Sequence, residues 1–344
     1  MKNDPALDWL LTQTPSHGQT LWLCDEHFYQ EAARLPTAEN HHYLTNRFDI
    51  AAQFTEQKLD CRFNDFDLSH IADQTLDTII YRLSKEKPVV QHCIQQAASK
   101  LTIGGQLLIA GLKNEGAKNF LEQAAKTLST SKATRKLGLA YAATLSKQSH
   151  SLPAKDDYTQ LHAHPKLAGF FTKPGQFGWQ KVDAGSEFLI QTLAQQNPAP
   201  AANSLLDLGC GYGYLALETV NKVLAKAPER IVLTDNNAAA LCSAERNSQH
   251  LAQSQVIAAD VGAGIEQRFD MIVCNPPFHQ GFQLSGDLTD RFLASAQNKL
   301  APGGAAYFVV NAFIPLESKA KTLFSKIETL ANNKQFKVLK LSQR

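Results

Sequence analysis

Cysteine, long apolar runs and net charge are all scarce in this chain of 344 residues. The six cysteines are spread out and none forms a Cys-x-x-Cys pair, which argues against a zinc site. A disulfide framework is also unexpected in so long a chain with so few cysteines. We therefore expect reduced cysteines, mostly as small core residues, and no bound metal.

No apolar stretch approaches the length of about 18 residues that a membrane-spanning helix needs. The first residues carry an early acid, Asp4, and no apolar segment, so they do not resemble a secretory signal. Together with reduced cysteines, these absences predict a cytoplasmic protein without a membrane partner.

The net charge is only +2, which neither requires nor excludes a nucleic acid, because a local basic patch can bind a phosphate backbone. Apolar material is ample, since hydrophobic residues make up 44% of the chain. At roughly 150 residues per domain, the length predicts about two domains.

The most regular alternation of strand-like and helix-like segments runs from about residue 203 to 312. Such alternation predicts βαβ units and a mainly parallel sheet. The expected strands are 204–208, 230–235, 255–260, 269–274 and 305–311. The expected helices are 216–225, 238–251 and 290–300.

An internal repeat adds a second unit of the same kind. Leu-Asp-Thr-Ile-Ile (76–80) resembles Phe-Asp-Met-Ile-Val (269–273), and each is followed by a helix, a Leu-x-x-Gly-Gly turn and another strand. The acid and the first glycine are 27 residues apart in one copy (77 to 104) and 33 in the other (270 to 303). This pattern can also recur by chance in α/β proteins. We interpret it as two tandem domains of related fold.

The expected domains are 1–150 and 173–344, joined by a linker over 151–172. Pro153, Pro165 and several polar residues interrupt the periodicity there. The predicted fold class is thus α/β, with two tandem Rossmann-like domains and mostly parallel sheets.

A glycine-rich loop, Asp-Leu-Gly-Cys-Gly-Tyr-Gly (207–213), follows a strand and opens a helix. Glycine lets the backbone turn sharply and lets a ligand lie against the main chain. The Gly-x-Gly-x-Gly spacing differs from the fingerprint of dinucleotide sites, and Asp207 would place negative charge near phosphates. An ammonium group suits this loop better, such as that in the methionine part of S-adenosylmethionine.

Acids end three successive strands: Asp207, Asp235 and Asp260. Ligands of open α/β sheets bind beyond the carboxyl ends of the strands, where all three would lie. Asp235 is placed to bind a ribose diol, and Asp260 an adenine amine. Each acid alone could equally be a helix N-cap or turn residue. The three acids together with the glycines favour a cofactor site.

The loop Asn275-Pro276-Pro277-Phe278 directly follows the fourth strand. Two prolines fix φ and remove two backbone donors, so the loop exposes acceptors beside an aromatic ring. A planar NH₂ would donate to Asn275 Oδ1 and to the Pro276 carbonyl, while its ring stacks on Phe278. Catalysis would then consist mostly of orienting two reactants, and a rigid turn with a buried phenylalanine is the alternative.

This loop resembles the Asn/Asp/Ser-Pro-Pro-Tyr/Phe/Trp motif of Rossmann-like class I methyltransferases, which modify adenine N6, guanine N2, cytosine N4 or protein glutamine. Within that group, the chain is similar to the C-type guanine-N2 methyltransferases of bacterial small-subunit ribosomal RNA. The resemblance covers roughly 168–340. The segments that carry it are 170–171, 183–186, 207–211, 275–281 and 310–313.

The resemblance implies S-adenosylmethionine as cofactor and methylation of a guanine N2 in 16S ribosomal RNA. Asn275, Pro276, Pro277 and Phe278 would hold the guanine. Tyr212 stands where the family has a small residue. The implied cofactor residues are Asp183, Gly185, Ser186, Asp207, Gly209, Cys210, Gly211, Gly213, Asp235, Asn236, Asp260, Val261 and Asn275. The implied partner is 16S ribosomal RNA or the 30S small subunit, and we expect a monomer.

The first half matches the family in layout, as an inactive copy of the methyltransferase domain. Tyr-Arg-Leu-Ser-Lys (81–85) replaces the Asn-Pro-Pro-Phe loop, and no glycine-rich loop precedes it. Residues 111–150 carry seven lysines and arginines against two acids. We predict an RNA-docking or supporting domain, although charge runs are often only solvated helix faces. The candidate RNA contacts are Arg82, Lys85, Lys87, Lys132, Arg135 and Lys136.

Alternative functions remain open at this point. The same loop could serve protein glutamine or adenine N6, and a non-catalytic RNA-binding assembly factor is a third possibility. Binding of a nucleic-acid substrate should weaken strongly as salt rises, whereas binding of a protein substrate should depend much less on salt. A base in a duplex would have to be splayed out to reach Phe278, so we expect single-stranded or partly assembled RNA to be preferred.

Overall fold

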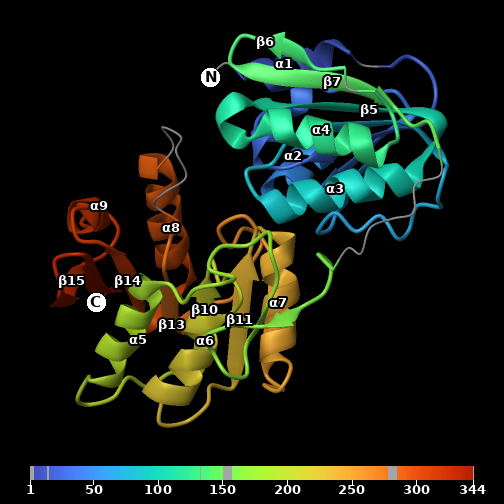
Figure 1. Cartoon of the computed structure of the whole chain (residues 1–344). Coiled ribbons are helices and arrows are strands. Elements are labelled where there is room, and N and C mark those ends of the chain that lie inside the picture. Colours follow the sequence, from blue (N-terminus) through green and yellow to red (C-terminus); the bar gives the residue numbers. More distant parts are fainter. Residues whose placement is uncertain (1–3, 14, 132, 150–156, 278–284, 344) are drawn as a thin grey trace. The chain divides into compact units, whose positions relative to one another are not determined.

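The computed structural model describes residues 4–13, 15–131, 133–149, 157–277 and 285–343. The chain forms two compact units, Met1–Gln160 and Leu161–Arg344 (Figure 1). Each unit has a seven-stranded sheet with helices on both faces. The predicted fold class, two tandem Rossmann-like α/β domains with mostly parallel sheets, is confirmed.

The sheet of the N-terminal unit has the order β3-β2-β1-β4-β5-β7-β6. The first five of these strands are parallel, whereas β7 runs antiparallel to β5 and β6 antiparallel to β7. The strands are β1 (Thr20–Cys24), β2 (His41–Thr45), β3 (Cys61–Phe63), β4 (Leu76–Arg82), β5 (Leu101–Leu112), β6 (Arg135–Leu137) and β7 (Ala140–Ser146).

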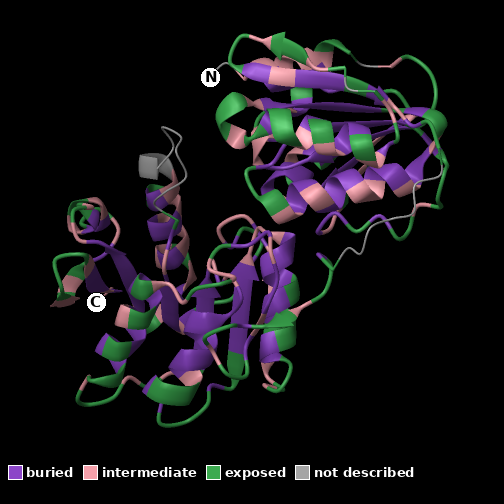
Figure 2. Cartoon of the chain, viewed as in Figure 1, coloured by how far each residue is buried: buried purple, intermediate pink, exposed green. Residues whose placement is uncertain are grey.

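Helices α1 (Pro5–Thr12) and α2 (Phe48–Glu56) cover one face of this sheet, and α3 (Lys87–Lys100) and α4 (Ala117–Thr127) cover the other. Figure 2 shows the buried strands between them. Helix α1 begins where it does because the Asp4 carboxylate accepts hydrogen bonds from the first free backbone N–H groups of the helix. Short 3₁₀ turns complete the unit: η1 (Glu26–Phe28), η2 (Ala32–Arg34) and η3 (Lys113–Glu115).

The sheet of the C-terminal unit has the same order, β12-β11-β10-β13-β14-β16-β15. Its first five strands are parallel, and β16 and β15 are antiparallel. The strands are β10 (Ser204–Leu208), β11 (Arg230–Asp235), β12 (Ser254–Ala258), β13 (Phe269–Cys274), β14 (Leu300–Asn311), β15 (Lys326–Asn332) and β16 (Phe336–Ser342).

One face of this sheet packs against three helices and the other against two. The helices of the first face are α5 (Ala184–Ala194), α6 (Tyr214–Glu218), which continues as the π-helical turn η4 (Thr219–Val223), and α7 (Ala238–Ser248). Those of the second face are α8 (Ser285–Lys299) and α9 (Leu316–Ala320). Among the described residues, no helix is long and apolar enough to span a membrane.

The two sheets correspond strand by strand. In β4, the Asp77 carboxylate accepts a hydrogen bond from Gln19 N, just before β1. In β13, the Asp270 carboxylate accepts one from Ser204 N, at the start of β10. The strand registers extend this match along the parallel strands, so the residues of β1, β2 and β4 have counterparts in β10, β11 and β13.

The Leu-x-x-Gly-Gly segments are not turns between a helix and a strand, as the sequence predicts, but parts of long strands. In β5, the pairing with β4 shifts after Leu101 and resumes at Gln106. β14 shows the same shift. Gly104 and Gly303 have φ of +84° and +77° at these points. A bulge uses such a residue to absorb extra chain while hydrogen bonding continues on both sides.

The boundary between the two units falls at Gln160/Leu161, inside the segment 151–172 that the sequence predicts as a linker. Residues 157–160 fold with the N-terminal unit, where Tyr158 is buried and donates a hydrogen bond to Asp65 at 2.7 Å. Residues 161–172 fold with the C-terminal unit and contain β8 (His162–Ala163) and β9 (Phe171–Thr172). Buried aromatic residues fix both ends, and periodicity does not detect such contacts.

Candidate active site

The glycine-rich loop connects β10 to α6 at the carboxyl end of the sheet. Gly209, Gly211 and Gly213 all have positive φ, at +81°, +54° and +86°. A Cβ on Gly213 would come within 3.0 Å of Leu233 Cδ2, so the loop must stay close to β11 there. A Cβ on Gly211 would meet no atom within 4 Å, which leaves open space beside the loop. The expected close approach of a ligand to the main chain is possible at Gly211.

Asp207 lies at the end of β10 and is fully buried. One carboxylate oxygen accepts a hydrogen bond from Ala216 N at 2.8 Å, which supplies the cap that the N-cap Gly213 cannot offer to α6. The other, Oδ1, has no hydrogen-bond partner among the described residues. Burial raises the pKa of Asp207 to about 7, and the nearby charge of Asp235 adds to this. A cationic ligand group would offset both effects.

Asp235 ends β11 and holds the glycine loop in place. Its carboxylate accepts hydrogen bonds from Gly211 N and from Asn237 N, both at 2.9 Å. Asn237 caps α7 and also donates from Nδ2 to Gly175 O at 2.9 Å. The segment around Gly175 is thereby fixed beside the end of β11. Asn236, between the two, is half-buried.

Asp260 follows β12 and forms an ion pair with Arg291 of α8, which the sequence analysis missed. Val261 follows with φ of +49°, an unusual conformation for a β-branched residue, and its carbonyl accepts a hydrogen bond from Ser295 Oγ at 2.7 Å. The counterpart of Val261 in the N-terminal unit, Phe66, also has positive φ, at +54°. This turn is therefore a property of the fold, present with or without a glycine-rich loop.

The Asn-Pro-Pro-Phe loop leaves β13 next to β10. Asn275 is half-buried, Pro276 is buried and Pro277 is exposed. Phe278 lies outside the described residues, so its predicted stacking role is not placed.

The Asn275 amide is held by the first turn of α5. Asn275 Nδ2 donates to Asp183 Oδ1 at 2.6 Å and to Ser186 Oγ at 2.9 Å. Because an ionised carboxylate only accepts, the facing atom must be the NH₂ group. This fixes the orientation of the amide and turns Oδ1 away from α5. From the sequence, Asp183 and Ser186 are expected to bind the cofactor, and no motif indicates their contact with Asn275.

Asp183, the N-cap of α5, also accepts a hydrogen bond from Ser186 N at 2.8 Å. Gly185 stands between them, and a Cβ there would come within 3.2 Å of the Phe336 ring in β16. A larger residue there would require the Asp183 carboxylate or the Phe336 ring to shift by a few tenths of an ångström. Cys210 of the glycine loop is buried, and burial raises the pKa of its thiol.

Together, these groups form a site suited to S-adenosylmethionine. The buried Asp207 Oδ1 needs a donor, the space beside Gly211 is open, and the Asp235 carboxylate lies next to both. The chemistry of this set fits a cationic amino-acid portion joined to a ribose. Asn275 lies one strand away from the glycine loop, since β13 pairs directly with β10.

The N-terminal unit has lost this set of residues at the corresponding positions. The strand registers place Trp22 at the position of Asp207, Cys24 at that of Gly209, Glu26 at that of Gly211, Thr45 at that of Asp235 and Arg82 at that of Asn275. Trp22 is fully buried in the core. Among the described residues, this candidate cofactor-binding set occurs in the C-terminal unit alone.

Arg82 is not an RNA contact, and this part of the prediction is wrong. Its side chain is 0% exposed and is paired with two carboxylates inside the N-terminal unit. The guanidinium donates to Asp4 Oδ2 at 3.0 Å and to the two oxygens of Glu115 at 2.7 and 3.1 Å. Because the guanidinium is buried and paired with two carboxylates, it does not reach the surface where a phosphate could meet it.

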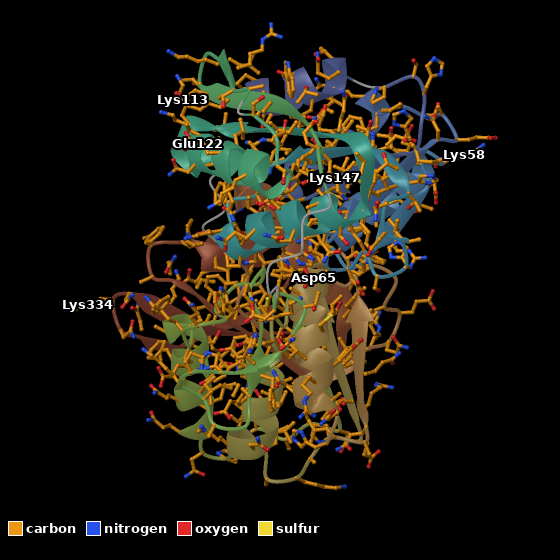
Figure 3. The ribbon with its side chains drawn as sticks, turned by 45° about the vertical axis from the view of Figure 1, so that its right-hand side comes forward. Lys58, Asp65, Lys113, Glu122, Lys147 and Lys334 are labelled. Atoms are coloured by element: carbon orange, nitrogen blue, oxygen red, sulfur yellow. The ribbon has the colours of Figure 1, made fainter. Side chains whose placement is uncertain are left out.

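The other candidate RNA contacts differ in their settings. Lys85 and Lys87 are exposed near the start of α3, and Arg135 and Lys136 are exposed on the edge strand β6. Lys132 lies outside the described residues. Of the other basic residues between 111 and 150, Lys147, labelled in Figure 3, is buried with Nζ donating to Leu101 O at 2.8 Å.

A cluster beside Arg82 offers three possible metal ligands within 4.8 Å of one another, on Asp25, Glu26 and His27. His27 Nδ1 is already hydrogen-bonded to Asp25 Oδ1 at 2.7 Å, and its Nε2 lies 3.7 Å from Glu115 Oε1. These carboxylates raise the pKa of His27 to about 10 against the opposing effect of burial. The imidazolium thus supplies the positive charge that this cluster requires.

Comparison with known proteins identifies both units. The methyltransferase small domain matches residues 168–340, and the methyltransferase small domain N-terminal matches 17–160. The ribosomal RNA small subunit methyltransferase C of Mannheimia succiniciproducens is 31% identical over 79% of this chain and 80% of its own length. That of Yersinia pestis is 33% identical over 76% and 73%.

A solved structure covers the whole chain. The T. thermophilus 16S rRNA N2 G1207 methyltransferase, in complex with AdoMet and guanosine, is 26% identical, with a TM-score of 0.83. The match covers 100% of this chain and 93% of that one.

Proposed function

This chain belongs to the methyltransferase small domain family, and from that premise we propose that its C-terminal unit methylates N2 of a guanine in 16S ribosomal RNA at the Asn275 loop. The chain is an S-adenosylmethionine-dependent methyltransferase. The observation that carries the assignment to Asn275 is the pair of hydrogen bonds from its Nδ2 to Asp183 and Ser186.

When bound, S-adenosylmethionine supplies the methyl group as a positively charged sulfonium. In our proposal, Asp207 and the glycine loop hold its amino-acid portion, and Asp235 holds its ribose. Asp260 takes the adenine side, where its ion pair with Arg291 would have to rearrange or be shared. Asp183 and Ser186, assigned to the cofactor from sequence, act instead on Asn275.

Asn275 orients the acceptor amine. With Nδ2 committed to α5, Oδ1 accepts one hydrogen of the guanine NH₂, and the Pro276 carbonyl accepts the other. Two such acceptors bias the nitrogen toward sp³ geometry. Its lone pair then points out of the plane of the guanine ring, toward the methyl group. The proton leaves after methyl transfer, so no general base is needed, and the rate gain comes from orientation.

The finer features of the substrate are also proposals. A guanine in a duplex would have to be splayed out, so we propose unpaired RNA in a free or partly assembled 30S subunit as substrate. Exposed Lys85, Lys87, Arg135 and Lys136 of the N-terminal unit are candidate phosphate contacts. We further propose a cytoplasmic monomer.

The test uses the full chain and 16S ribosomal RNA from a strain that lacks this protein. The wild type should produce N2-methylguanosine at one site, detected by mass mapping of nucleosides. Asn275→Ala should retain S-adenosylmethionine binding by calorimetry and lose at least about 100-fold in kcat, because the amine is no longer aligned.

Asn203→Ala is the matched control, since Asn203 is exposed just before β10, at the opposite end of the same sheet. It should retain full activity. Full activity in Asn275→Ala would overturn the role of the loop. Methylation of a protein or of adenine by the wild type would overturn the assignment of the substrate.

A further inference from the structure

Phe313 is the most exposed of the large hydrophobic side chains at the surface of the described residues, at 80%. It lies in the loop between β14 and α9, at the carboxyl end of the sheet. Single exposed apolar residues are common on protein surfaces, so exposure alone does not indicate a function. The setting of Phe313 is what distinguishes it.

The loop that carries Phe313 is anchored on both sides. Ala312 N donates to Gln335 O at 2.9 Å, and Ile314 N donates to Asn311 O at 3.0 Å. Ile314 packs against the core, and Leu316 is fully buried. These contacts fix the backbone on both sides of Phe313, so the loop keeps this residue at the surface. A loop whose backbone is already fixed loses less entropy on binding than a flexible one.

The turn between β15 and β16 presents a cation beside this loop. Lys334 is exposed there and projects at the edge of the C-terminal unit in Figure 3. The side chains of Asn332 and Asn333 fix the turn by accepting hydrogen bonds from Lys334 N and Phe336 N, at 2.9 and 2.7 Å. Lys334 takes no part in the ion pairs found among the described residues. We call residues 312–314 and 332–335 the rim.

Lys334 occupies a conformation that favours glycine. Its φ is +72°, and an L-residue in the left-handed region is disfavoured relative to glycine. Its counterpart in the N-terminal unit is Gly138, with φ of +54°. Stability alone would favour glycine at both positions.

The aromatic residue of the rim is also absent from the inactive copy. The register of β5 and β7 places Asn114 at the position of Phe313, while Lys113 N donates to Leu139 O as Ala312 N does to Gln335 O. The two turns are therefore built alike. The aromatic ring occurs in the unit that carries the glycine loop and Asn275, whereas the corresponding turn of the N-terminal unit has a lysine, Lys113, at the position of Ala312 and no aromatic residue.

The rim lies next to the proposed site of the target base. Continuing the register of β13 and β14 places Asn275 beside Val309. Asn311 lies one strand across and two residues further along, so its Cα is about 8 Å from that of Asn275. Phe336, which follows the rim, contacts Gly185 in the turn of α5 that holds Asn275. The rim and the site thus share one edge of the sheet and one set of supporting contacts.

We infer that the rim binds the unpaired RNA strand flanking the target guanine. Phe313 stacks on a neighbouring base, and Lys334 contacts a phosphate. Single-stranded nucleic acid is bound by this combination of an aromatic platform and a cation. The inference rests on the proposed function, because the RNA must enter the Asn275 site.

The test compares Phe313→Ala, Lys334→Gly and wild type in the full chain, with a single-stranded RNA oligonucleotide that copies the methylated region. Phe313→Ala should weaken binding between about 5-fold and about 150-fold in fluorescence anisotropy, the range for loss of one stacked base. Lys334→Gly should reduce the slope of log K against log salt by about 0.7, as for one phosphate contact on a single strand. S-adenosylmethionine affinity should be unchanged in both.

Leu139→Ala is the matched control, because Leu139 is 74% exposed on the corresponding turn of the N-terminal unit. It should bind RNA as the wild type does. Unchanged RNA affinity in Phe313→Ala, or an equal loss of RNA affinity in Leu139→Ala, would overturn the inference. The proposed function would still stand if the wild type methylates guanine N2. A wild type that binds no RNA would overturn both.

Discussion

Asn275 and Arg82 occupy corresponding positions in the two units, and each donates a hydrogen bond to the aspartate that caps a helix. One donor is an amide and the other is a guanidinium. Asn275 donates to Asp183, the N-cap of α5. Arg82 donates to Asp4, the N-cap of α1, which is the first helix of its own unit. The contact is present in the unit that lacks the glycine loop. We therefore interpret the capping aspartate as a positioning group for the residue after the fourth strand.

This interpretation predicts the behaviour of Ser186→Ala. The substitution removes one of the two acceptors of Asn275 Nδ2 and leaves the N-cap in place. One hydrogen bond is worth about 1 kcal/mol, so kcat should fall about five-fold through looser orientation of the amide. S-adenosylmethionine affinity, measured by calorimetry, should not change.

Ser254→Ala serves as the comparison. Ser254 is half-buried and hydrogen-bonded to Ser248 O and Leu251 O at the opposite end of the sheet. It should leave kcat unaffected. If Ser186→Ala weakened cofactor binding and spared kcat, Ser186 would be a cofactor contact, as the family resemblance implies.

At the scale of elements, the glycine-rich loop combines tight packing with open space. Gly213 must lie close to β11, whereas Gly211 borders the proposed cofactor site. Asp235 connects the two elements by accepting the hydrogen bond of Gly211 N. The loop is therefore pre-formed, and its shape depends on the end of β11.

Gly211→Ala tests whether the open space is the cofactor site. An L-residue at φ of +54° destabilises the fold by about 1–2 kcal/mol, but its Cβ meets no protein atom. The methyl group would occupy ligand space instead. A clash that costs about 1.4 kcal/mol of binding free energy lowers affinity ten-fold. We therefore expect S-adenosylmethionine affinity to fall at least about ten-fold.

Gly264→Ala has the same backbone cost, since Gly264 has φ of +80° and no atom within 4 Å of its built Cβ. Both variants should lose similar stability in denaturant unfolding. Cofactor affinity should fall in Gly211→Ala alone, and equal affinities would place the cofactor elsewhere.

Over the whole molecule, the two units have the same fold but carry different side chains at the carboxyl ends of their strands. In the C-terminal unit, the proposed cofactor site lies there. In the N-terminal unit, an ionic network of Asp4, Arg82, Glu115, His27 and Asp25 occupies the corresponding place. This network connects α1, β4 and η3 and so contributes to the stability of its own unit.

The network predicts a pH-dependent stability of the N-terminal unit. The pKa of His27 rises from 6.5 to about 10 in the fold, so its contribution is complete below pH 6.5 and is lost as pH rises toward 10. The pKa of Glu115 falls from 4.5 to about 2, so its contribution is present above pH 4.5 and is lost as pH falls toward 2. Each pKa unit corresponds to about 1.4 kcal/mol.

His27→Gln should therefore be less stable than wild type at pH 6, by a margin that shrinks toward pH 10. Stability is measured by denaturant unfolding followed by tryptophan fluorescence in a Trp179→Phe background. The remaining tryptophans, Trp9 and Trp22, both lie in the N-terminal unit, so the signal reports on that unit. His42→Gln is the control, since His42 pairs with Asp60 at the surface, where ion pairs contribute little. A margin for His27→Gln that does not change with pH would contradict the account.

Much of the C-terminal unit could be predicted from the sequence. Strands such as 204–208 and 269–274 have apolar runs bounded by glycine or proline, and the glycines of 209–213 are required by local backbone conformation. The repeat was visible because both sheets bury the same pattern of strand residues. These are local properties, which amino-acid order determines directly.

The tertiary structure decided what depends on contacts between distant residues. Arg82 looks like a surface cation in sequence, but the fold brings Asp4 and Glu115 to it and buries all its donors. The contact that orients Asn275 joins residues 92 positions apart. The sequence by itself determined two related α/β domains, the glycine loop and the Asn-Pro-Pro loop. Only the folded chain determined which polar groups are paired, because burial and partner both depend on the packing of the whole unit.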